Sequence, residues 1–355
     1  MQVDQAKEIR KGEQLDQVKL AEYLSTSLEN FSGIDQVKQF PGGYSNLTYL
    51  IIAGKQQYVL RRPPFGANIK SAHDMGREFR VLTALEGLYE AIPKAVAYCE
   101  DEDVLGAPFY VMERVEGIIL RPSNPPKPIP SPDMMRKISI ATVDNLAKLH
   151  QLEIEKSGLS KLGKPEGYTQ RQVDGWIRRY QKAKTDEVPA MDEIAEYLQS
   201  EIPSNTETTF IHNDYKYDNI VLDAERLDHI LAVLDWEMAT VGNPLMDLGA
   251  ALSYWVEAKD SPALQMFNLT HLPGNLNRME VLERYSKQTA RSVDNIDYYF
   301  VFASYKLGVI IQQIYARYVK GHTKDPRFAM LGHVVEACAT QGQKAMKLGR
   351  IHDLN

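Results

Sequence analysis

A proline-rich segment divides this chain into two parts of different character. Residues 121–132 read RPSNPPKPIPSP and contain six prolines. Proline fixes φ and removes a backbone donor, so this segment can form neither a helix interior nor a central strand. We expect it to run extended over the surface. A chain interrupted in this way cannot be one continuous bundle or one continuous sheet, so its two sides are expected to fold differently.

The part before this segment is predicted to be a small antiparallel sheet with one helix. Four runs rich in β-branched and aromatic residues predict strands: 47–53, 56–61, 95–99 and 107–112. The first two runs flank Gly54-Lys55, which is a short hairpin pattern. Apolar residues at every third position of 75–88, with charges between them, predict a helix. We expect residues 1–113 to form an N-terminal lobe, with 1–30 as a helical or flexible extension.

The part after this segment is predicted to be mostly helical. Apolar residues at helical intervals predict these helices: 133–152, 170–183, 191–199, 244–256, 276–292, 295–320 and 326–348. Short apolar runs bounded by Asp and Asn predict brief strands: 210–211, 219–222 and 229–234. The tyrosine-rich stretch 298–318 is predicted to pack in the core. The whole chain is therefore predicted to be α+β, with a larger helical C-terminal lobe over 114–355.

Composition and charge exclude several classes of protein. With 41 basic and 47 acidic side chains, the net charge is −6, so the chain lacks the basic surface that nucleic acid requires. Its two cysteines lie far apart and cannot form a disulfide framework or a zinc site, which indicates a reducing compartment. No run approaches the ~18 apolar residues that span a bilayer. We expect a cytoplasmic protein with neither nucleic acid nor membrane as a partner. The sequence does not indicate its oligomeric state.

A cluster of polar residues in the second part points to phosphoryl transfer. His212, Asp214 and Asn219 form the pattern His-x-Asp-x-x-x-x-Asn, and Asp235 follows where the apolar run 230–234 ends. Phosphoryl transfer requires acidic or amide oxygens that hold Mg²⁺ against triphosphate oxygens, and a further carboxylate that orients the attacking hydroxyl. Asn219 and Asp235 suit the metal, and Asp214 suits the hydroxyl.

Two neighbours of Asp214 have supporting interpretations. His212 is expected to brace the catalytic loop. Lys216 is two residues after Asp214 and could reach the transferred phosphate. It could equally be a solvated surface lysine, and both interpretations of Lys216 stay open.

The same residues resemble a known family. HNDYKYDN (212–219) and LDWEMATVGNPLMDLG (234–249) are similar to the catalytic loop and the metal-binding segment of the aminoglycoside phosphotransferase family, whose fold is similar to that of protein kinases. Within that family, the chain looks closest to the phosphotransferase-like domains fused to some acyl-CoA dehydrogenases. Further motifs carry this closer resemblance: YVLRRPP (58–64), SAHDMGREFRVLTAL (71–85), FYVMERVEG (109–117) and YTQRQVDGWIRRY (168–180). The resemblance covers roughly residues 35–340.

The resemblance implies a protein-kinase-like fold of two lobes that uses ATP and Mg²⁺. It places the catalytic loop at 210–223 and the metal-binding segment at 230–249, and it makes Asp247 the acid that hydrogen-bonds the catalytic loop. The N-terminal lobe would bind the nucleotide. Its phosphates would lie under the loop that contains Gly42, Gly43, Ser45 and Asn46. Adenine would bind the backbone of a hinge that contains Met112, Glu113 and Val115.

One position departs from the usual pattern. Most kinase-like enzymes have a lysine after two apolar strand residues, and this chain has Arg61. Arginine keeps the charge and can clamp phosphate with two donors, but it is not interchangeable with lysine. Its expected partner is Glu78. The alternative is an ordinary surface ion pair, which contributes little. Trp236-Glu237 stands where protein kinases have Phe-Gly, which favours a small-molecule kinase that is permanently assembled.

The resulting hypothesis is an ATP- and Mg²⁺-dependent phosphotransferase that acts on a hydroxyl of a small molecule. Arg171, Arg178 and Arg179 form an arginine-rich helix that suits a phosphate-bearing acceptor, such as a hydroxyacyl-CoA. They could also be solvated arginines that bind nothing. Two alternatives remain: an aminoglycoside or other small-alcohol kinase, and a nucleotide-binding pseudokinase that serves as a scaffold. The presence of every expected polar residue disfavours the scaffold.

Overall fold

The computed structural model describes residues 3–41, 46–66, 74–204, 207–321 and 326–354. The chain forms two compact units. The first comprises Met1–Ile119, Ile220–Arg226 and Ile230–Ala239, and the second comprises Leu120–Asn219, Leu227–His229 and Thr240–Asn355. The chain thus returns to the first unit twice after leaving it. The lobe boundary between residues 113 and 114 stays a prediction.

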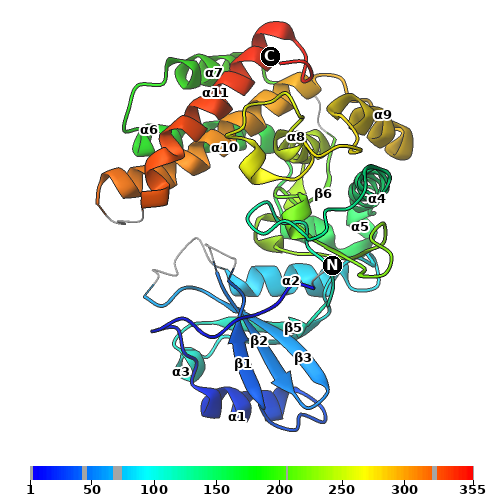
Figure 1. Cartoon of the computed structure of the whole chain (residues 1–355), viewed down its shortest axis with the longest axis vertical. Coiled ribbons are helices and arrows are strands. Elements are labelled where there is room, and N and C mark those ends of the chain that lie inside the picture. The colour runs from blue at the N-terminus through cyan, green and yellow to red at the C-terminus, as the bar shows by residue number, and fades with distance from the viewer. Residues whose placement is uncertain (1–2, 42–45, 67–73, 205–206, 322–325, 355) are drawn as a thin grey trace. The chain divides into compact units, whose positions relative to one another are not determined.

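Five antiparallel strands form the sheet of the first unit: β1 (Gln36–Gln39), β2 (Leu47–Ala53), β3 (Gln56–Arg62), β4 (Ala95–Cys99) and β5 (Phe109–Glu113). Figure 1 shows this sheet, in which the strand order is β1-β2-β3-β5-β4. β2 and β4 have the predicted bounds, and β3 and β5 each end one residue later than predicted. Gly54 turns the β2–β3 hairpin with a φ of 61°, a conformation that glycine adopts without strain.

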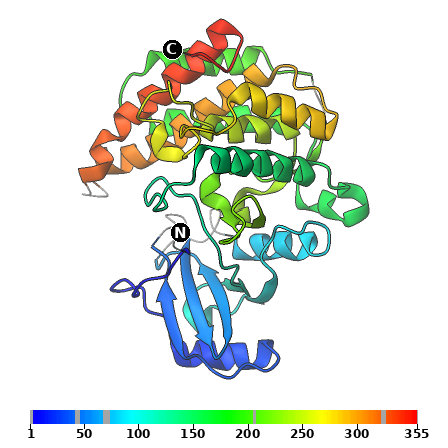
Figure 2. The same cartoon turned by 45° about the vertical axis from the view of Figure 1, so that its right-hand side comes forward.

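Helices cover both faces of this sheet. α1 (Gln17–Ser27) and α2 (Met75–Leu85) lie on opposite sides of it in Figure 1 and in Figure 2. Because side chains alternate along a strand, Leu60 of β3 packs into the apolar core that contains Leu20 and Leu24 of α1, whereas Arg61 contacts Glu78 of α2. The helical alternative for residues 1–30 is thus observed over 17–27.

A separate hairpin completes the first unit. β7 (Ile220–Leu222) pairs antiparallel with β8 (Ile230–Val233), and a β-bridge joins Ile118 to Leu222. The short helix η3 (Trp236–Met238) follows β8. This hairpin brings the end of β8, and therefore Asp235, into the same unit as Arg61 and Glu78.

The second unit is mostly helical. Its helices are α4 (Pro132–His150), α5 (Ile154–Ser157), α6 (Tyr168–Ala183), α7 (Pro189–Ser200), α8 (Pro244–Tyr254), α9 (Arg278–Thr289), α10 (Ile296–Val319) and α11 (Leu331–Leu348). α10 packs against α6, α7, α8 and α11. Its residues Tyr298, Tyr299 and Tyr305 are buried, which confirms that the tyrosine-rich stretch is core. No helix in the described ranges combines the length and the apolar character needed to cross a membrane.

The remaining elements are short, and the sequence patterns found only some of them. The proline-rich segment has no helix until Pro132, where Ser131 caps the start of α4. The segment 326–348 begins as a short 3-10 helix, η5 (Pro326–Met330), before α11. Strands β6 (Thr209–Ile211) and β9 (Thr240–Gly242) pair with each other. Further short helices are α3 (Glu102–Leu105), η1 (Leu159–Leu162), η2 (Tyr217–Asn219) and η4 (Gln265–Phe267). β1, β9, α3 and α5 were not predicted, because three or four residues carry too little periodicity.

Candidate active site

The first unit holds a buried ion pair between its sheet and α2. Arg61 on β3 donates to Glu78 on α2, and these residues are 8% and 0% exposed. Burial acts to lower the pKa of Arg61, but the charge of Glu78, together with smaller effects of neighbours such as Asp235, raises that pKa above its ordinary value. The guanidinium therefore stays charged. The alternative of an ordinary surface ion pair is wrong, because both side chains are buried.

Asp235 contacts the same guanidinium from the end of β8. Nη2 of Arg61 lies 3.1 Å from Oδ1 of Asp235. The φ of Asp235 is 66°, in a region that few residues other than glycine adopt. Trp236 is buried and holds this conformation, since its backbone N–H donates to Glu78 over 3.2 Å and its Nε1 donates to the carbonyl of Val233 over 2.8 Å. The Asp235 side chain is 32% exposed, so its carboxylate is accessible to a ligand.

The loop predicted to cover the nucleotide phosphates is described only at its last residue. Nδ2 of Asn46 donates to Oε2 of Glu237 over 2.9 Å, and Asn46 is 1% exposed. Gly42, Gly43 and Ser45 lie outside the described residues. The contact of Asn46 ties the start of β2 to the segment that carries Asp235.

The predicted hinge begins within β5, which contains Met112 and Glu113, and continues past its end. Met112 is paired with Val59, and the N–H of Glu113 donates to the carbonyl of Lys94 over 2.9 Å. Val115 comes after the strand. Within the described chain, no hydrogen bond involves its backbone. A purine edge needs such a backbone donor, so Val115 offers one.

The second unit places three of the expected catalytic residues in mutual contact. Nζ of Lys216 lies 2.7 Å and 2.6 Å from the two carboxylate oxygens of Asp214. Nδ2 of Asn219 donates over 2.9 Å to the carbonyl and over 2.9 Å to Oδ2 of Asp214. Burial acts to raise the pKa of Asp214, but Lys216, together with smaller effects of His212 and Lys306, lowers that pKa below its ordinary value. Lys216 is only 17% exposed in its side chain, so the interpretation as a solvated surface lysine is wrong.

These contacts also determine how the amide of Asn219 is oriented. The oxygens of an ionised Asp214 can only accept hydrogen bonds, so the NH₂ group of Asn219 must face them. Its Oδ1 then points away and has no donor among the residues that the structure describes. An amide oxygen left free in this way fits a hard cation such as Mg²⁺.

Asp247 supports the catalytic loop from α8. Its carboxylate accepts the N–H of His212 over 2.7 Å and the N–H of Asn213 over 2.6 Å. His150 Nε2 lies 3.0 Å from the same carboxylate, and its Nδ1 lies 2.7 Å from the hydroxyl of Tyr285. Burial acts to raise the pKa of Asp247, but the hydrogen bond from His150 and the nearby charges lower it. The hydrogen bonds that the resemblance implied for Asp247 are therefore present, and His212 also braces the loop by accepting the N–H of Asp214 on Nδ1 over 3.2 Å.

Sequence patterns missed one charged residue beside this loop. Lys306 of α10 is 7% exposed, and its Nζ donates to the carbonyl of Asn213 over 3.0 Å. Burial lowers its pKa from 10.5 to about 8, against the charges of Asp214 and Asp247, which raise it. Its signal in the sequence was its isolation, since it is the only charged residue from Tyr298 to Ile311. A lone charge in a buried helix needs a polar partner.

The three arginines of α6 have different surroundings. Arg171 donates to the backbone carbonyls of Lys164 and Glu166, so it holds the loop before the helix. Arg178 and Arg179 are exposed. The Arg179 guanidinium lies 4.6 Å from the ring of Trp176, and the Nζ of Lys306 lies 5.6 Å from the same ring. Arg179 therefore shares a cationic region with Lys306.

The expected site residues form two connected sets. The first unit holds Arg61, Glu78 and Asp235, and the second unit holds Asp214, Lys216 and Asn219. In the described part of the chain, no group of three or more His, Cys, Asp or Glu side chains could hold a metal by itself.

Comparison with known proteins identifies the family of this chain. A model of a phosphotransferase enzyme family matches residues 36–282. Human acyl-CoA dehydrogenase family member 11 is 33% identical over 341 residues, which are 94% of this chain and 43% of that protein. Mouse acyl-CoA dehydrogenase family member 10 is 31% identical over 95% of this chain and 32% of that protein. The chain spans less than half the length of these relatives.

Solved structures show the same fold. A Ralstonia eutropha protein named "putative aminoglycoside phosphotransferase" is 30% identical, has a TM-score of 0.81, and is matched over 94% of this chain and 99% of its own. Choline kinase from Cryptosporidium parvum has a TM-score of 0.65 at 12% identity, over 94% of this chain and 96% of its own. The predicted α+β, protein-kinase-like fold is confirmed, as is the resemblance to domains carried by acyl-CoA dehydrogenase relatives. This chain belongs to the phosphotransferase enzyme family and is related to its aminoglycoside phosphotransferase-like members, which are small-molecule kinases.

Proposed function

We propose that this chain transfers the γ-phosphate of ATP, with Mg²⁺, to a hydroxyl of a small acceptor. The observation that carries this proposal is the carboxylate of Asp214, whose side chain is only 18% exposed. Lys216 lowers its pKa, and both Lys216 and Asn219 orient it through hydrogen bonds. Asp247 supports the loop on which Asp214 lies. A scaffold that only binds nucleotide has no need of a carboxylate fixed in this way, so these contacts favour an active kinase.

Asp214 is proposed to orient the acceptor hydroxyl and to receive its proton. A carboxylate whose pKa is lowered is a weak base. Transfer of a phosphoryl group passes through a loose transition state in which little charge develops on the attacking oxygen until late. A weak base that positions the hydroxyl is therefore sufficient. As the bond between the hydroxyl oxygen and the γ-phosphorus forms, the bond from that phosphorus to ADP breaks, and the hydroxyl proton moves to Asp214.

Two residues of the first unit are proposed to bind nucleotide. Arg61 has a planar guanidinium that Glu78 and Asp235 hold in place, so it can present paired donors to phosphate oxygens. The free backbone N–H of Val115 is the proposed contact to adenine. Gly42, Gly43, Ser45 and Asn46 remain proposed as the phosphate loop, and Met112 and Glu113 remain proposed as the hinge.

The donor set fits Mg²⁺. The partly exposed carboxylate of Asp235 and the free Oδ1 of Asn219 are oxygen ligands of the kind that this ion prefers. When bound, Mg²⁺ supplies positive charge that offsets the charge of the triphosphate.

The acceptor is proposed to be an anionic hydroxylated molecule of the hydroxyacyl-CoA type. Arg179 and Lys306 place positive charge around Trp176, and guanidinium groups bind phosphate oxygens. The curated relatives are named as acyl-CoA dehydrogenases, which favours a thioester. Arg178 and Arg171 were expected to share this role, but Arg171 is already bonded to its own loop. An aminoglycoside, a polycation, is disfavoured by this charge, although the name of the Ralstonia relative keeps it as the second candidate.

A panel of acceptors tests this proposal. Purified protein is incubated with ATP and Mg²⁺ and, in turn, hydroxyacyl-CoAs, kanamycin, choline and sugars, and phosphorylated product is measured by mass spectrometry. We expect a product from a hydroxyacyl-CoA and little from kanamycin. Efficient phosphorylation of kanamycin with no activity on any CoA thioester would replace the first candidate by the second. No transfer to any acceptor, with ATP bound, would favour the scaffold.

A further inference from the structure

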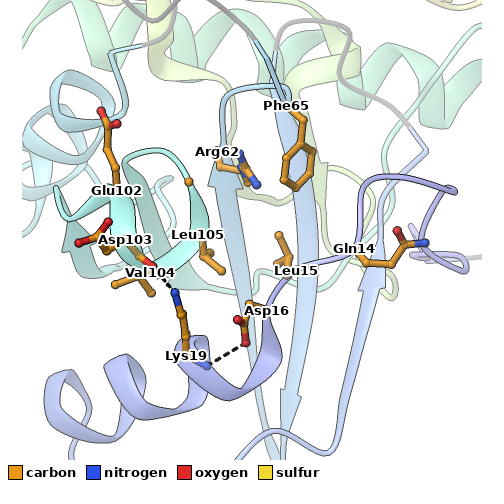
Figure 3. Close-up of a pocket in the computed structure, with 11 residues that line it drawn as sticks. Gln14, Leu15, Asp16, Lys19, Arg62, Phe65, Glu102, Asp103, Val104 and Leu105 are labelled. Atoms are coloured by element: carbon orange, nitrogen blue, oxygen red, sulfur yellow. Dashed lines mark hydrogen bonds between the residues drawn. The ribbon is translucent and has the colours of Figure 1, made fainter.

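The first unit contains a pocket on the face of the sheet away from Arg61. The cavity has a volume of about 400 Å³. Figure 3 shows its lining, which includes Leu15, Lys19, Arg62, Phe65, Val104 and Leu105. These residues come from the start of α1, the end of β3 and the short helix α3. Because side chains alternate along β3, Arg62 lies on the α1 side of the sheet while Arg61 faces α2.

Arg62 is a buried cation without a counterion. It is 2% exposed, and its Nε and Nη1 have no hydrogen-bond partner. No carboxylate in the described ranges forms an ion pair with it. Burial lowers the pKa of Arg62, and only the nearby Tyr49 opposes this effect. Its neighbour Arg61 is bonded to both Glu78 and Asp235, so the two consecutive arginines differ completely in their partners.

An arginine in this state is unfavourable for folding alone. A buried charge that lacks a partner destabilises the folded chain, whereas an apolar residue of similar size in its place is often neutral or stabilising. The ring of Phe65 lies 3.6 Å from the Arg62 guanidinium, but an aromatic face only partly replaces a counterion. Phe65 is itself 44% exposed, and both side chains of this stacked pair line the pocket.

The other lining residues indicate the chemical character of the rest of the ligand. Leu15, Val104 and Leu105 form apolar walls. Asp16 lies at the edge, where its carboxylate already accepts the N–H groups of Val18 and Lys19. Apolar walls beside the unpaired guanidinium of Arg62 suit a ligand with an apolar body and one negative charge.

The charged residues at the rim of the pocket indicate what charge the ligand carries. Glu102 and Asp103 are exposed at the edge of the pocket. Lys19 carries one positive charge against these two carboxylates, and its Nζ donates to the backbone carbonyl of Asp103 over 2.8 Å. Acidic groups near a site repel a dianion more strongly than a monoanion, so inorganic phosphate is disfavoured here.

We propose that this pocket binds a monocarboxylate with an apolar body, such as a short fatty acid, through the guanidinium of Arg62. The site lies apart from Arg61, so it is distinct from the proposed nucleotide contacts of the first unit. Guanidinium and carboxylate match in a two-bond geometry, and this match supplies the counterion that Arg62 lacks.

Calorimetric titration with hexanoate tests the proposal, with hexan-1-ol and inorganic phosphate as comparison probes. We expect hexanoate to bind more tightly than either comparison probe, and to bind equally well when ATP and Mg²⁺ are present. In Arg62→Met, hexanoate affinity should fall about 10- to 100-fold, which is the effect of losing a charge-assisted pair. The same variant should have a higher Tm without ligand. Arg80→Met, at an exposed arginine of the same unit, should change neither quantity.

A second variant keeps the proposal testable if Arg62→Met does not fold. Gln14 is exposed and also lines the pocket, so Gln14→Glu should fold and should weaken hexanoate binding several-fold through charge repulsion. Equal binding of hexanoate and hexan-1-ol would overturn the proposal. Unchanged hexanoate affinity in both pocket variants, or loss of hexanoate binding on addition of ATP and Mg²⁺, would also overturn it.

Discussion

Replacing Lys306 by methionine should stabilise the protein at neutral pH. Burial lowers the pKa of Lys306 from 10.5 to about 8. The unfolded chain therefore binds this proton more tightly than the folded chain does, so the charge opposes folding below pH 8. This destabilisation by the charge of Lys306 decreases as the pH rises from 8 to 10.5. At about 1.4 kcal/mol per pKa unit, the charge lowers the free energy of unfolding by about 3 kcal/mol at pH 7.

Methionine removes the destabilising charge of Lys306 but also removes a hydrogen bond. The carbonyl of Asn213 loses its 3.0 Å partner, which costs about 1 to 2 kcal/mol. The free energy of unfolding of Lys306→Met should therefore exceed that of the parent protein by about 1 to 2 kcal/mol at pH 7. This gain should disappear by about pH 10, where the folded parent protein no longer holds the proton.

Urea unfolding at pH 7 and pH 10 measures this difference directly. Lys287→Met provides the control, because Lys287 is exposed on α9, and its effect on stability should not depend on pH. If Lys306→Met destabilised the protein equally at both pH values, the reasoning about the charge of Lys306 would be refuted. The charge of Lys306 also lowers the pKa of Asp214, so in Lys306→Met the acidic limb of the pH–rate profile should move to higher pH.

Three further outcomes are expected. Asp247→Asn should lower the free energy of unfolding, measured in urea, by about 3 kcal/mol, because a buried acceptor of several hydrogen bonds loses its charge. The stabilisation by the Asp247 carboxylate is present above the pKa of this group in the unfolded chain. It is lost as the pH falls through the lower pKa of the folded state. Asp144→Asn, which breaks a half-exposed pair, should cost less than about 1 kcal/mol. Arg61→Lys should weaken ATP binding about tenfold in calorimetry, because one ammonium cannot replace a guanidinium that contacts two carboxylates. The control variant Arg80→Lys should leave ATP binding unchanged. Arg179→Glu should raise the KM of an anionic acceptor more than that of a neutral alcohol, and equal rises would contradict a role in acceptor binding.

Much of the fold could be predicted because the longer elements have clear periodicity. The hairpin around Gly54 and the helix that begins at Met75 were predicted within a few residues. β1 and β9 were not, because strands of three or four residues owe their existence to a partner strand rather than to their own pattern. The returns of Ile220–Arg226 and Ile230–Ala239 to the first unit depend on such pairings and could not be inferred from local patterns.

Some residues of the candidate site could be predicted from the sequence, and others could not. Asp214 and Asn219 were predicted because a short loop fixes their spacing. Asp247 lies far from them in the sequence, on α8, and only the family resemblance predicted it. Lys306 was missed, since its contact to Asn213 joins residues that are far apart in the sequence. Arg171 was expected to face a substrate, but its hydrogen bonds to Lys164 and Glu166 hold its own loop. A charge pattern alone does not show which partner an arginine takes.

The most direct test of the central claim is the turnover of Asp214→Asn on an identified acceptor. Asparagine keeps the size of Asp214 but can neither carry the negative charge nor accept the hydroxyl proton. We expect kcat to fall by roughly 10² to 10⁴, while the Kd for nucleotide stays nearly unchanged. Asp228→Asn, at an exposed aspartate of the second unit, should retain full turnover. If Asp214→Asn transferred phosphate as fast as Asp228→Asn, Asp214 would have no part in the reaction and the proposed mechanism would be contradicted.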